Sequence, residues 1–306
     1  MPSASLVAKL AAVWFTPAPA ARLGLLRILI GGWAFYYLAR RRKMMRQVAA
    51  TDPHLFAPVG VAKVHPAPLP ARLVNMLVHA TLVANVAFIL GWRHRVTGPL
   101  YSGLFLWLLS YRNSWSMIFH NDNVMVLHIL TLGLTRSADA WSLDAMGKRP
   151  PTSWQYGWPI RLMNTMTVLT YFVSGVAKVK GPLGWTWATG ESLRSQVAVD
   201  ALRKELLGSA GAPLAPRLYH AVGLFRLLAI GSLALELGAP LALAHRWLAR
   251  GWAANAFLLH WGIYAVMKIT FRYQMAGIMY LSFFEVERVG AWVLTWIARR
   301  WEEGRR

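Results

Sequence analysis

Lys178 is the residue with the clearest capacity for chemistry, because it lies in an apolar stretch. The stretch from Trp158 to Lys180 is long enough to cross a bilayer. An ammonium group at the centre of such a helix costs roughly 2.5–3.5 kcal/mol. Tyr171, Ser174 and Lys178 are spaced to share one helix face, which we expect to look into the protein. Alternatively, Lys178 and Lys180 lie at the end of the helix and extend their ammonium groups to the lipid headgroups.

A buried lysine suits proton transfer, because burial lowers its pKa toward neutrality. Such a group needs a partner. Glu236 is the one acid inside an apolar span, and it is the natural partner for Arg27, Lys178 or Arg226. Arg27 has no acid near it in sequence, so its partner must come from another helix. The sequence does not choose among these bases.

Histidines are spread along the apolar segments. His120 opens the polar motif HNDN (His120 to Asn123), whose Asn121 and following residues are good helix N-caps. Capping does not explain why a second histidine, His128, follows eight residues later. A metal site is disfavoured, because no two of these histidines have a recognised ligand spacing; they are His79, His120, His128, His220 and His260. We expect no metal.

The elements that carry these residues are those of a membrane protein. Of the 306 residues, 56% are hydrophobic, 16 are Trp and only 12 are acidic, which is too apolar for a soluble domain of this size. We expect an all-α, polytopic integral membrane bundle of about eight transmembrane helices. The apolar segments are Arg22–Ala39, Ala71–Gly91, Gly98–Phe119, Val124–Leu134, Trp158–Lys180, Arg217–His245, Trp252–Thr270 and Tyr273–Phe284.

The domain organisation follows from these segments. We expect an interfacial N-terminal segment over residues 1–20, the bundle over 21–285, and an amphipathic basic tail over 286–306. The proline-rich stretch Thr51–Pro70 predicts an irregular loop. The loop Arg136–Pro159 is rich in Trp, Pro and Gly, and its indoles suit the headgroup level. The region from Gly181 to about Arg217 is polar enough to lie outside the bilayer.

The net charge of +21 comes from short basic runs between apolar segments, such as Arg40–Arg46. No interleaved aromatic residues accompany these runs, so anionic lipid headgroups are the expected partner and nucleic acid is not. The absence of cysteine excludes disulfides and thiolate chemistry. Lys9 and the break at Thr16–Ala20 argue against a cleavable signal. We expect a multi-pass protein of a bacterial-type cell membrane, with its orientation and any partner subunit undetermined.

Several motifs together resemble one family. YFVSGVAKVKGPLGWTWATGESL (Tyr171–Leu193) is similar to the lysine motif of the HTTM (horizontally transferred transmembrane) domain, the membrane part of vitamin K-dependent gamma-carboxylases. SWSMIFHNDNVMVL (Ser114–Leu127), WSLD (Trp141–Asp144), Glu236 and FLLH (Phe257–His260) resemble further family features in the same order. The resemblance covers residues 22–284.

The resemblance implies chemistry at particular residues. In the carboxylases a lysine base deprotonates a reduced naphthoquinone, and oxygenation then produces a base strong enough to remove a glutamate gamma-proton before carbon dioxide adds. Lys178 matches that lysine, while Ala177 stands where the carboxylases have a second one. His120 matches the family's histidine, with a one-residue ambiguity against Asn121. A reduced, vitamin K-like quinone is the cofactor that the resemblance implies.

One departure bears on the substrate. The carboxylases carry a large extramembrane portion after the bundle, whereas fewer than about thirty residues follow the last predicted span of this chain. Protein carboxylation is therefore not the expected reaction, and other quinols or lipids suit the site.

Three interpretations remain open. The first is a membrane enzyme with Lys178 as the base and with His120, His260 and Glu236 shaping a pocket for a lipid-soluble substrate. The second is a transporter-like bundle, against which no inverted repeat is visible. The third is a structural or assembly protein in which Arg27, Glu236 and Lys178 form a buried ion network.

Overall fold

The computed structural model describes residues 5–48, 50–115, 118, 120–148 and 150–303. Over these ranges it has no strand, only an isolated bridge between Ala18 and Ser153, so the predicted all-α fold is confirmed. The chain divides into two compact units. Unit 1 comprises Met1–Met163 with Glu285–Arg306, and unit 2 comprises Asn164–Phe284.

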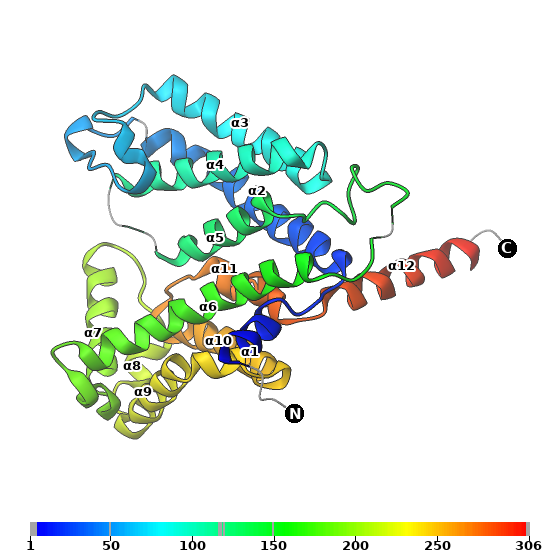
Figure 1. Cartoon of the computed structure of the whole chain (residues 1–306). Coiled ribbons are helices and arrows are strands. Elements are labelled where there is room, and N and C mark those ends of the chain that lie inside the picture. Colours follow the sequence, from blue (N-terminus) through cyan, green and yellow to red (C-terminus); the bar gives the residue numbers. More distant parts are fainter. Residues whose placement is uncertain (1–4, 49, 116–117, 119, 149, 304–306) are drawn as a thin grey trace. The chain divides into compact units, whose positions relative to one another are not determined.

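Unit 1 is a set of helices in which α4 packs against α3 and α5, and α2 packs against α3, α5 and α12 (Figure 1). Its elements are α1 (Leu6–Trp14), α2 (Ala20–Val48), the 3-10 turns η1 (Pro53–Leu55) and η2 (Gly60–Val64), α3 (Ala71–Leu90), α4 (His94–Asn113), α5 (His120–Leu134), the first part of α6 (Trp154–Lys180) and α12 (Val286–Glu303).

Close helix contact in unit 1 depends on small residues. A Cβ atom on Gly98 of α4 would lie 2.5 Å from the carbonyl oxygen of Gly133 on α5, so the two backbones touch where both residues are glycine. Elsewhere in unit 1, the core contains Leu38 of α2, Val78 of α3 and Leu108 of α4, which are almost fully buried. The glycine contact brings the start of α4 beside the end of α5.

Unit 2 begins inside α6 and ends before α12. Its further elements are η3 (Gly184–Thr189), α7 (Glu191–Leu206), α8 (Leu214–Leu218), α9 (Val222–Leu237), η4 (Ala239–Leu243), α10 (Arg246–Met267), α11 (Arg272–Met275) and η5 (Ile278–Phe283). One core cluster joins α7, α8 and α9 through the buried side chains of Val197, Ala215 and Phe225. Most of the residues singled out in the lysine motif lie in this unit.

Among the described residues, α3 is the one helix both long and apolar enough to cross a membrane. α5 has 15 residues and α9 has 16, fewer than the roughly 20 that a straight span requires. α2 is long enough at 29 residues but includes the basic cluster at residues 40–46. The predicted eight spans are therefore a proposal and not a finding.

Several predicted helix limits were wrong. The basic cluster at residues 40–46 does not end the first helix, which continues to Val48, because Arg, Lys and Met are good helix formers. The predicted segment 217–245 is divided among α8, α9 and η4. The predicted segment 273–284 is not one helix, because Gly277 adopts a left-handed φ of 74° between α11 and η5.

Each predicted flanking segment, residues 1–20 and residues 286–306, contains a helix. α1 occupies the first and α12 the last. In unit 1, Arg22 of α2 forms a two-point ion pair with Glu287 of α12, at 2.6 and 2.9 Å.

Candidate functional site

Lys178 is held by Glu236 in unit 2. Its Nζ atom lies 2.6 Å from each carboxylate oxygen of Glu236, which projects from α9 toward the last turns of α6. The side chain of Lys178 is 23% exposed and that of Glu236 is 9% exposed. Of the three bases that the sequence offered to Glu236, the structure pairs it with Lys178.

Gly175 brings the two helices together at this pair. A Cβ atom added to Gly175 would lie 2.9 Å from Cβ of Glu236 and 3.1 Å from Leu237. A larger residue would push α9 away from α6, one turn before Lys178. The glycine in the SGVAK stretch therefore sets the distance across which the ion pair forms.

Trp187 covers the lysine from the connection that follows α6. Nζ of Lys178 lies 5.5 Å from the centre of the Trp187 ring, a distance typical of a cation–π contact. The indole Nε1 of Trp187 is buried and has no hydrogen-bond partner within the part of the chain that the structure describes. A hydrogen-bond donor is therefore left unused beside the ion pair.

Tyr171 belongs to a second cluster, two helical turns earlier on α6. Its hydroxyl lies 2.5 Å from the hydroxyl of Tyr280, and both hydroxyls lie 3.4 Å from Nδ1 of His260. Nδ1 is 2.8 Å from the carbonyl of Ala256, so this nitrogen carries the proton. Trp252 closes the cluster, with its ring edge-on to Tyr171 at 5.0 Å.

Ser174 does not join either cluster. Its side chain is exposed and donates to the carbonyl of Thr170 in its own helix at 3.1 Å. The expectation that Ser174 would share a buried face with Tyr171 was wrong. A face defined by positions i, i+3 and i+7 is wide, and α9 and α10 cover only the part of it that carries Tyr171 and Lys178.

Arg27 is fully buried in unit 1 and its hydrogen bonds are to backbone. Its guanidinium donates to the carbonyls of Ser137 at 2.6 Å, Trp141 at 2.5 Å and Ile89 at 3.3 Å. These contacts replace the acid that the sequence analysis assigned to it, and Glu236 is not its partner. Arg27 therefore fixes the loop after α5 against the end of α3.

Asp122 is a buried acid that the sequence analysis treated as a helix cap. It lies within α5, accepts from Nη1 of Arg112 at 2.9 Å, and also accepts a short hydrogen bond from the Tyr37 hydroxyl. Arg112 further donates to Tyr37 and to Asn113, at 2.6 and 3.1 Å. Arg112 lies in an apolar stretch ten residues before Asp122, and a base in such a stretch is the signal in the sequence that could have revealed the pair.

The side chains of His120 and Asn121 lie outside the described residues, so their predicted roles stay predictions. His128 is buried, and its Nε2 lies 3.3 Å from the carbonyl of Met163. No three His, Asp or Glu residues among the described ones gather as a metal site would require.

Asp144 of the WSLD stretch caps α4. Its two carboxylate oxygens accept from the backbone nitrogens of Arg93 and His94, at 2.8 and 2.7 Å. His94 lies at the first position of α4, before the predicted span that starts at Gly98. Burial, and next the charge of Arg27, lower the pKa of His94 below its ordinary value of 6.5.

The comparison with protein families agrees with these motifs. The model of the HTTM domain matches residues 15–271, which is most of the chain. The chain belongs to the HTTM domain family. No curated protein and no solved structure matches it. The matched range includes Lys178, Glu236, Trp187 and His260, whereas Tyr280 lies beyond it.

Membership in the HTTM family supports an association with the membrane, as does the length of α3. Within this HTTM domain the structure brings Lys178 together with Glu236, and Tyr171 together with His260. It places Arg27 and Asp122 in a separate unit, where each has its own partners.

Proposed function

We propose that this HTTM domain is a multi-pass membrane enzyme in which Lys178 takes a proton from a lipid-soluble, quinol-like substrate. One observation carries the proposal: Nζ of Lys178 lies 2.6 Å from both oxygens of Glu236 while nearly a quarter of the lysine side chain stays exposed. The pair is thus held by the fold and is still open to a reactant.

Lys178 acts as a base only when it is a neutral amine. Glu236 supplies a place for the ammonium proton, because transfer from Lys178 converts a charged pair into a neutral one, and apolar surroundings disfavour charge. The amine then accepts the proton of a substrate hydroxyl. Nitrogen becomes an ammonium again, and the negative charge remains on the substrate oxygen.

Trp187 suits the charge that develops in this step. Its indole N–H is buried and unpartnered beside Lys178 within the described part of the chain, so it is available to donate to an oxyanion. A preorganised hydrogen-bond donor near a developing negative charge is a common source of catalytic stabilisation. The regenerated ammonium of Lys178 adds attraction from the other side.

The open side of α6 suits an apolar reactant. Leu169 and Val173 are 48% and 60% exposed on the side of α6 that faces away from Tyr171 and Lys178, and Ser174, one turn before Lys178, is exposed as well. An apolar surface of this kind favours a hydrophobic tail over a water-soluble substrate. The buried Tyr171 cluster lies on the same face of α6 as Lys178, two turns earlier, and supports that face.

The test uses the full chain in lipid vesicles with reduced menaquinone as the probe. We expect wild type to retain the quinol and to promote its oxygen-dependent oxidation. Lys178→Met should retain the probe and lose the oxidation, and Glu236→Gln should slow it. Lys180→Met is the matched control, because Lys180 is exposed and lies two residues from the pair.

Thermal stability separates this function from a structural role. If wild type never retains the probe and Lys178→Met unfolds at a much lower temperature, the pair only holds α6 to α9. If Lys180→Met loses oxidation as fully as Lys178→Met, the chemistry does not depend on the pair.

A further inference from the structure

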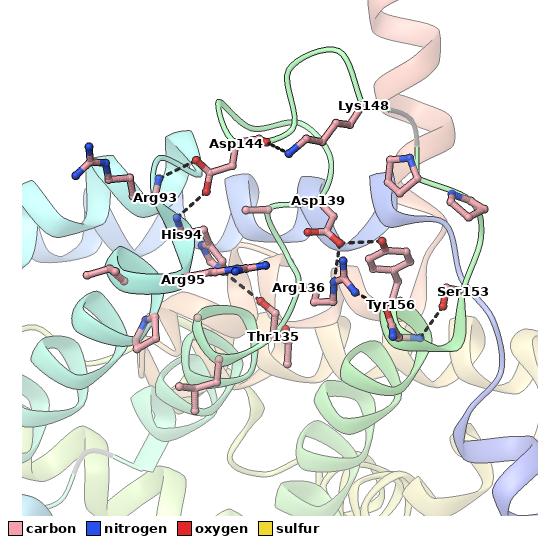
Figure 2. Close-up of a pocket in the computed structure, with 18 residues that line it drawn as sticks. Arg93, His94, Arg95, Thr135, Arg136, Asp139, Asp144, Lys148, Ser153 and Tyr156 are labelled. Atoms are coloured by element: carbon pink, nitrogen blue, oxygen red, sulfur yellow. Dashed lines mark hydrogen bonds and ion pairs between the residues drawn. The ribbon is translucent and has the colours of Figure 1, made fainter.

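Unit 1 contains a large pocket at the ends of three helices and beside one loop. The pocket has a volume of about 1420 Å³ and lies between the start of α4, the end of α5, the loop that follows α5, and the start of α6 (Figure 2). The whole lysine motif (Tyr171–Leu193) belongs to unit 2, so none of its residues lines this pocket.

Basic side chains outnumber acidic ones around this pocket. Arg93, Arg95, Arg136 and Lys148 line it together with two acids, Asp139 and Asp144. Both acids are already engaged. Asp144 caps the backbone of α4, and Asp139 accepts from Arg136 Nε at 2.8 Å and from the Tyr156 hydroxyl at 2.9 Å.

Two groups in the pocket lack partners. The guanidinium of Arg95 has no hydrogen bond or ion pair among the described residues, and Figure 2 shows it directed from α4 toward the side of Arg136. His94 is 94% buried, since 6% of it is exposed, and its Nδ1 has no partner within the described ranges. Its Nε2 is used, at 3.2 Å from the carbonyl of Thr135. Nε2 therefore carries the proton and Nδ1 is an acceptor, so the group in this pocket that favours an anion with several acceptor oxygens is the unused guanidinium of Arg95.

The same pocket has an apolar side. Val96, Pro99, Leu134, Pro150 and Pro151 line it, and Val96 and Leu134 are 66% and 65% exposed. A small water-soluble anion has no apolar part that could bury this surface. A ligand with a charged head and hydrocarbon chains satisfies both sides at once.

The position of the pocket relative to α3 also indicates lipid. α3 is the helix of membrane-spanning length, it ends at Leu90, and the pocket residue Arg93 follows three residues later. If α3 crosses the bilayer, the pocket lies at headgroup depth, where exposed indoles such as Trp92 and Trp154 are usual.

We infer that this pocket binds the phosphate headgroup of an anionic phospholipid. Arg95, Arg136 and Lys148 contact the phosphate oxygens, and the apolar side receives the start of the acyl chains. The binding is independent of the proposed reaction at Lys178. A phosphate ester in solution presents the same oxygens, so the experiment has to separate the two sources.

The experiment measures the unfolding temperature of the full chain in detergent against added short-chain phosphatidylglycerol. Wild type should be stabilised in a saturable way. Arg95→Gln/Lys148→Gln should require at least about tenfold more lipid for half of the effect, because it removes two charged donors. Both residues are exposed; Arg95 has no partner to lose among the described residues, and Lys148 loses one exposed hydrogen bond, to the carbonyl of Asp144.

Matched controls identify the ligand and the site. Arg42→Gln/Arg46→Gln removes the same charge from the exposed basic cluster near the end of α2 and should behave as wild type. Inorganic phosphate and glycerol phosphate should give no stabilisation at equal concentration, and short-chain phosphatidylcholine much less than phosphatidylglycerol. Equal stabilisation by free phosphate would overturn the lipid assignment. Equal responses of the two double variants would overturn the site, and an unfolded Arg95→Gln/Lys148→Gln protein would contradict the structure that gives Arg95 no partner.

Discussion

Two cation–carboxylate pairs in this HTTM domain have different physical characters. In unit 1, the side chains of Arg112 and Asp122 are 5% and 6% exposed, and Tyr37 and Asn113 add further hydrogen bonds to the pair. In unit 2, Lys178 is 23% exposed beside Glu236. We call the Arg112–Asp122 pair closed, because both side chains are buried, and the Lys178–Glu236 pair open, because the lysine is partly exposed.

The chemistry of the two cations reinforces this difference. A guanidinium keeps its proton under all ordinary conditions, so the Arg112–Asp122 pair has no proton to exchange. A lysine gives up its proton readily when burial or a neighbour favours the neutral amine. Charge in an apolar segment therefore has two uses in this protein: Arg112 and Asp122 hold helices in place, and Lys178 and Glu236 are suited to proton transfer.

The largest expected effect comes from breaking the closed pair. Asp122→Asn keeps the shape of the side chain but removes the buried carboxylate charge that faces Arg112 at 2.9 Å, so we expect a loss of about 3–5 kcal/mol in the free energy of unfolding. Denaturant titration in detergent measures it. Asp139→Asn, which affects the largely exposed contact with Arg136, should cost within about 1 kcal/mol. Similar losses in both variants would show that the burial of Asp122 is unimportant.

A smaller loss is expected when α6 and α9 are forced apart. Gly175→Val places side-chain atoms where Cβ of Glu236 and the Leu237 side chain now lie, and overpacking of this kind costs about 1–3 kcal/mol. Gly223→Val is the matched control in α9, because nothing lies within 4 Å of its Cβ position. Retention of wild-type stability and quinol oxidation by Gly175→Val would mean that the close approach does not set the pair.

The Lys178–Glu236 pair should contribute less to the free energy of unfolding than the Arg112–Asp122 pair. Lys178→Met leaves a carboxylate that can neutralise itself by taking up a proton, so we expect a loss of about 1–2 kcal/mol. The comparison with Asp122→Asn in the same denaturant titration is decisive. A loss at Lys178 as large as that at Asp122 would mean that both pairs are structural.

The smallest effect concerns His94 and pH. Burial and the charge of Arg27 lower its pKa, whereas Asp144 and the carbonyls of Leu132 and Thr135 act in the opposite direction. Below about pH 6.5 the unfolded chain binds a proton at this residue that the folded chain does not. Stability should therefore fall as the pH decreases through this range, by at most about 1.4 kcal/mol per pH unit. His94→Gln should show a shallower fall, and an unchanged slope would mean that the pH dependence does not arise from His94.

Part of this arrangement could be read from the sequence. The free-energy cost of a charged lysine or glutamate in an apolar segment predicts that both residues need partners. Three bases in the predicted spans were candidates to pair with Glu236. The choice among them required the path of α9, which Gly175 fixes by contact and not by any local pattern. Arg27 could not be assigned, because backbone carbonyls are present at every residue and only the fold selects three of them.

Asp122 shows a different limit. An acid next to two asparagines before an apolar run is normally a helix cap, and the local sequence contains nothing that predicts the contact of Asp122 with Arg112. The helix begins at His120, so Asp122 lies inside it and turns toward Arg112. Helix limits were missed for a similar reason, because Gly277 reveals its left-handed φ only in three dimensions.

The central claim is that Lys178 removes a proton from a bound quinol. The most direct test is the absorption spectrum of reduced menaquinone bound to the protein without oxygen, recorded against pH. In wild type the bound quinol should lose its proton at a lower pH than in detergent alone, and in Lys178→Met it should bind and stay neutral over the same range. A quinol that stays neutral in wild type, or loses its proton equally well in Lys178→Met, would contradict the account.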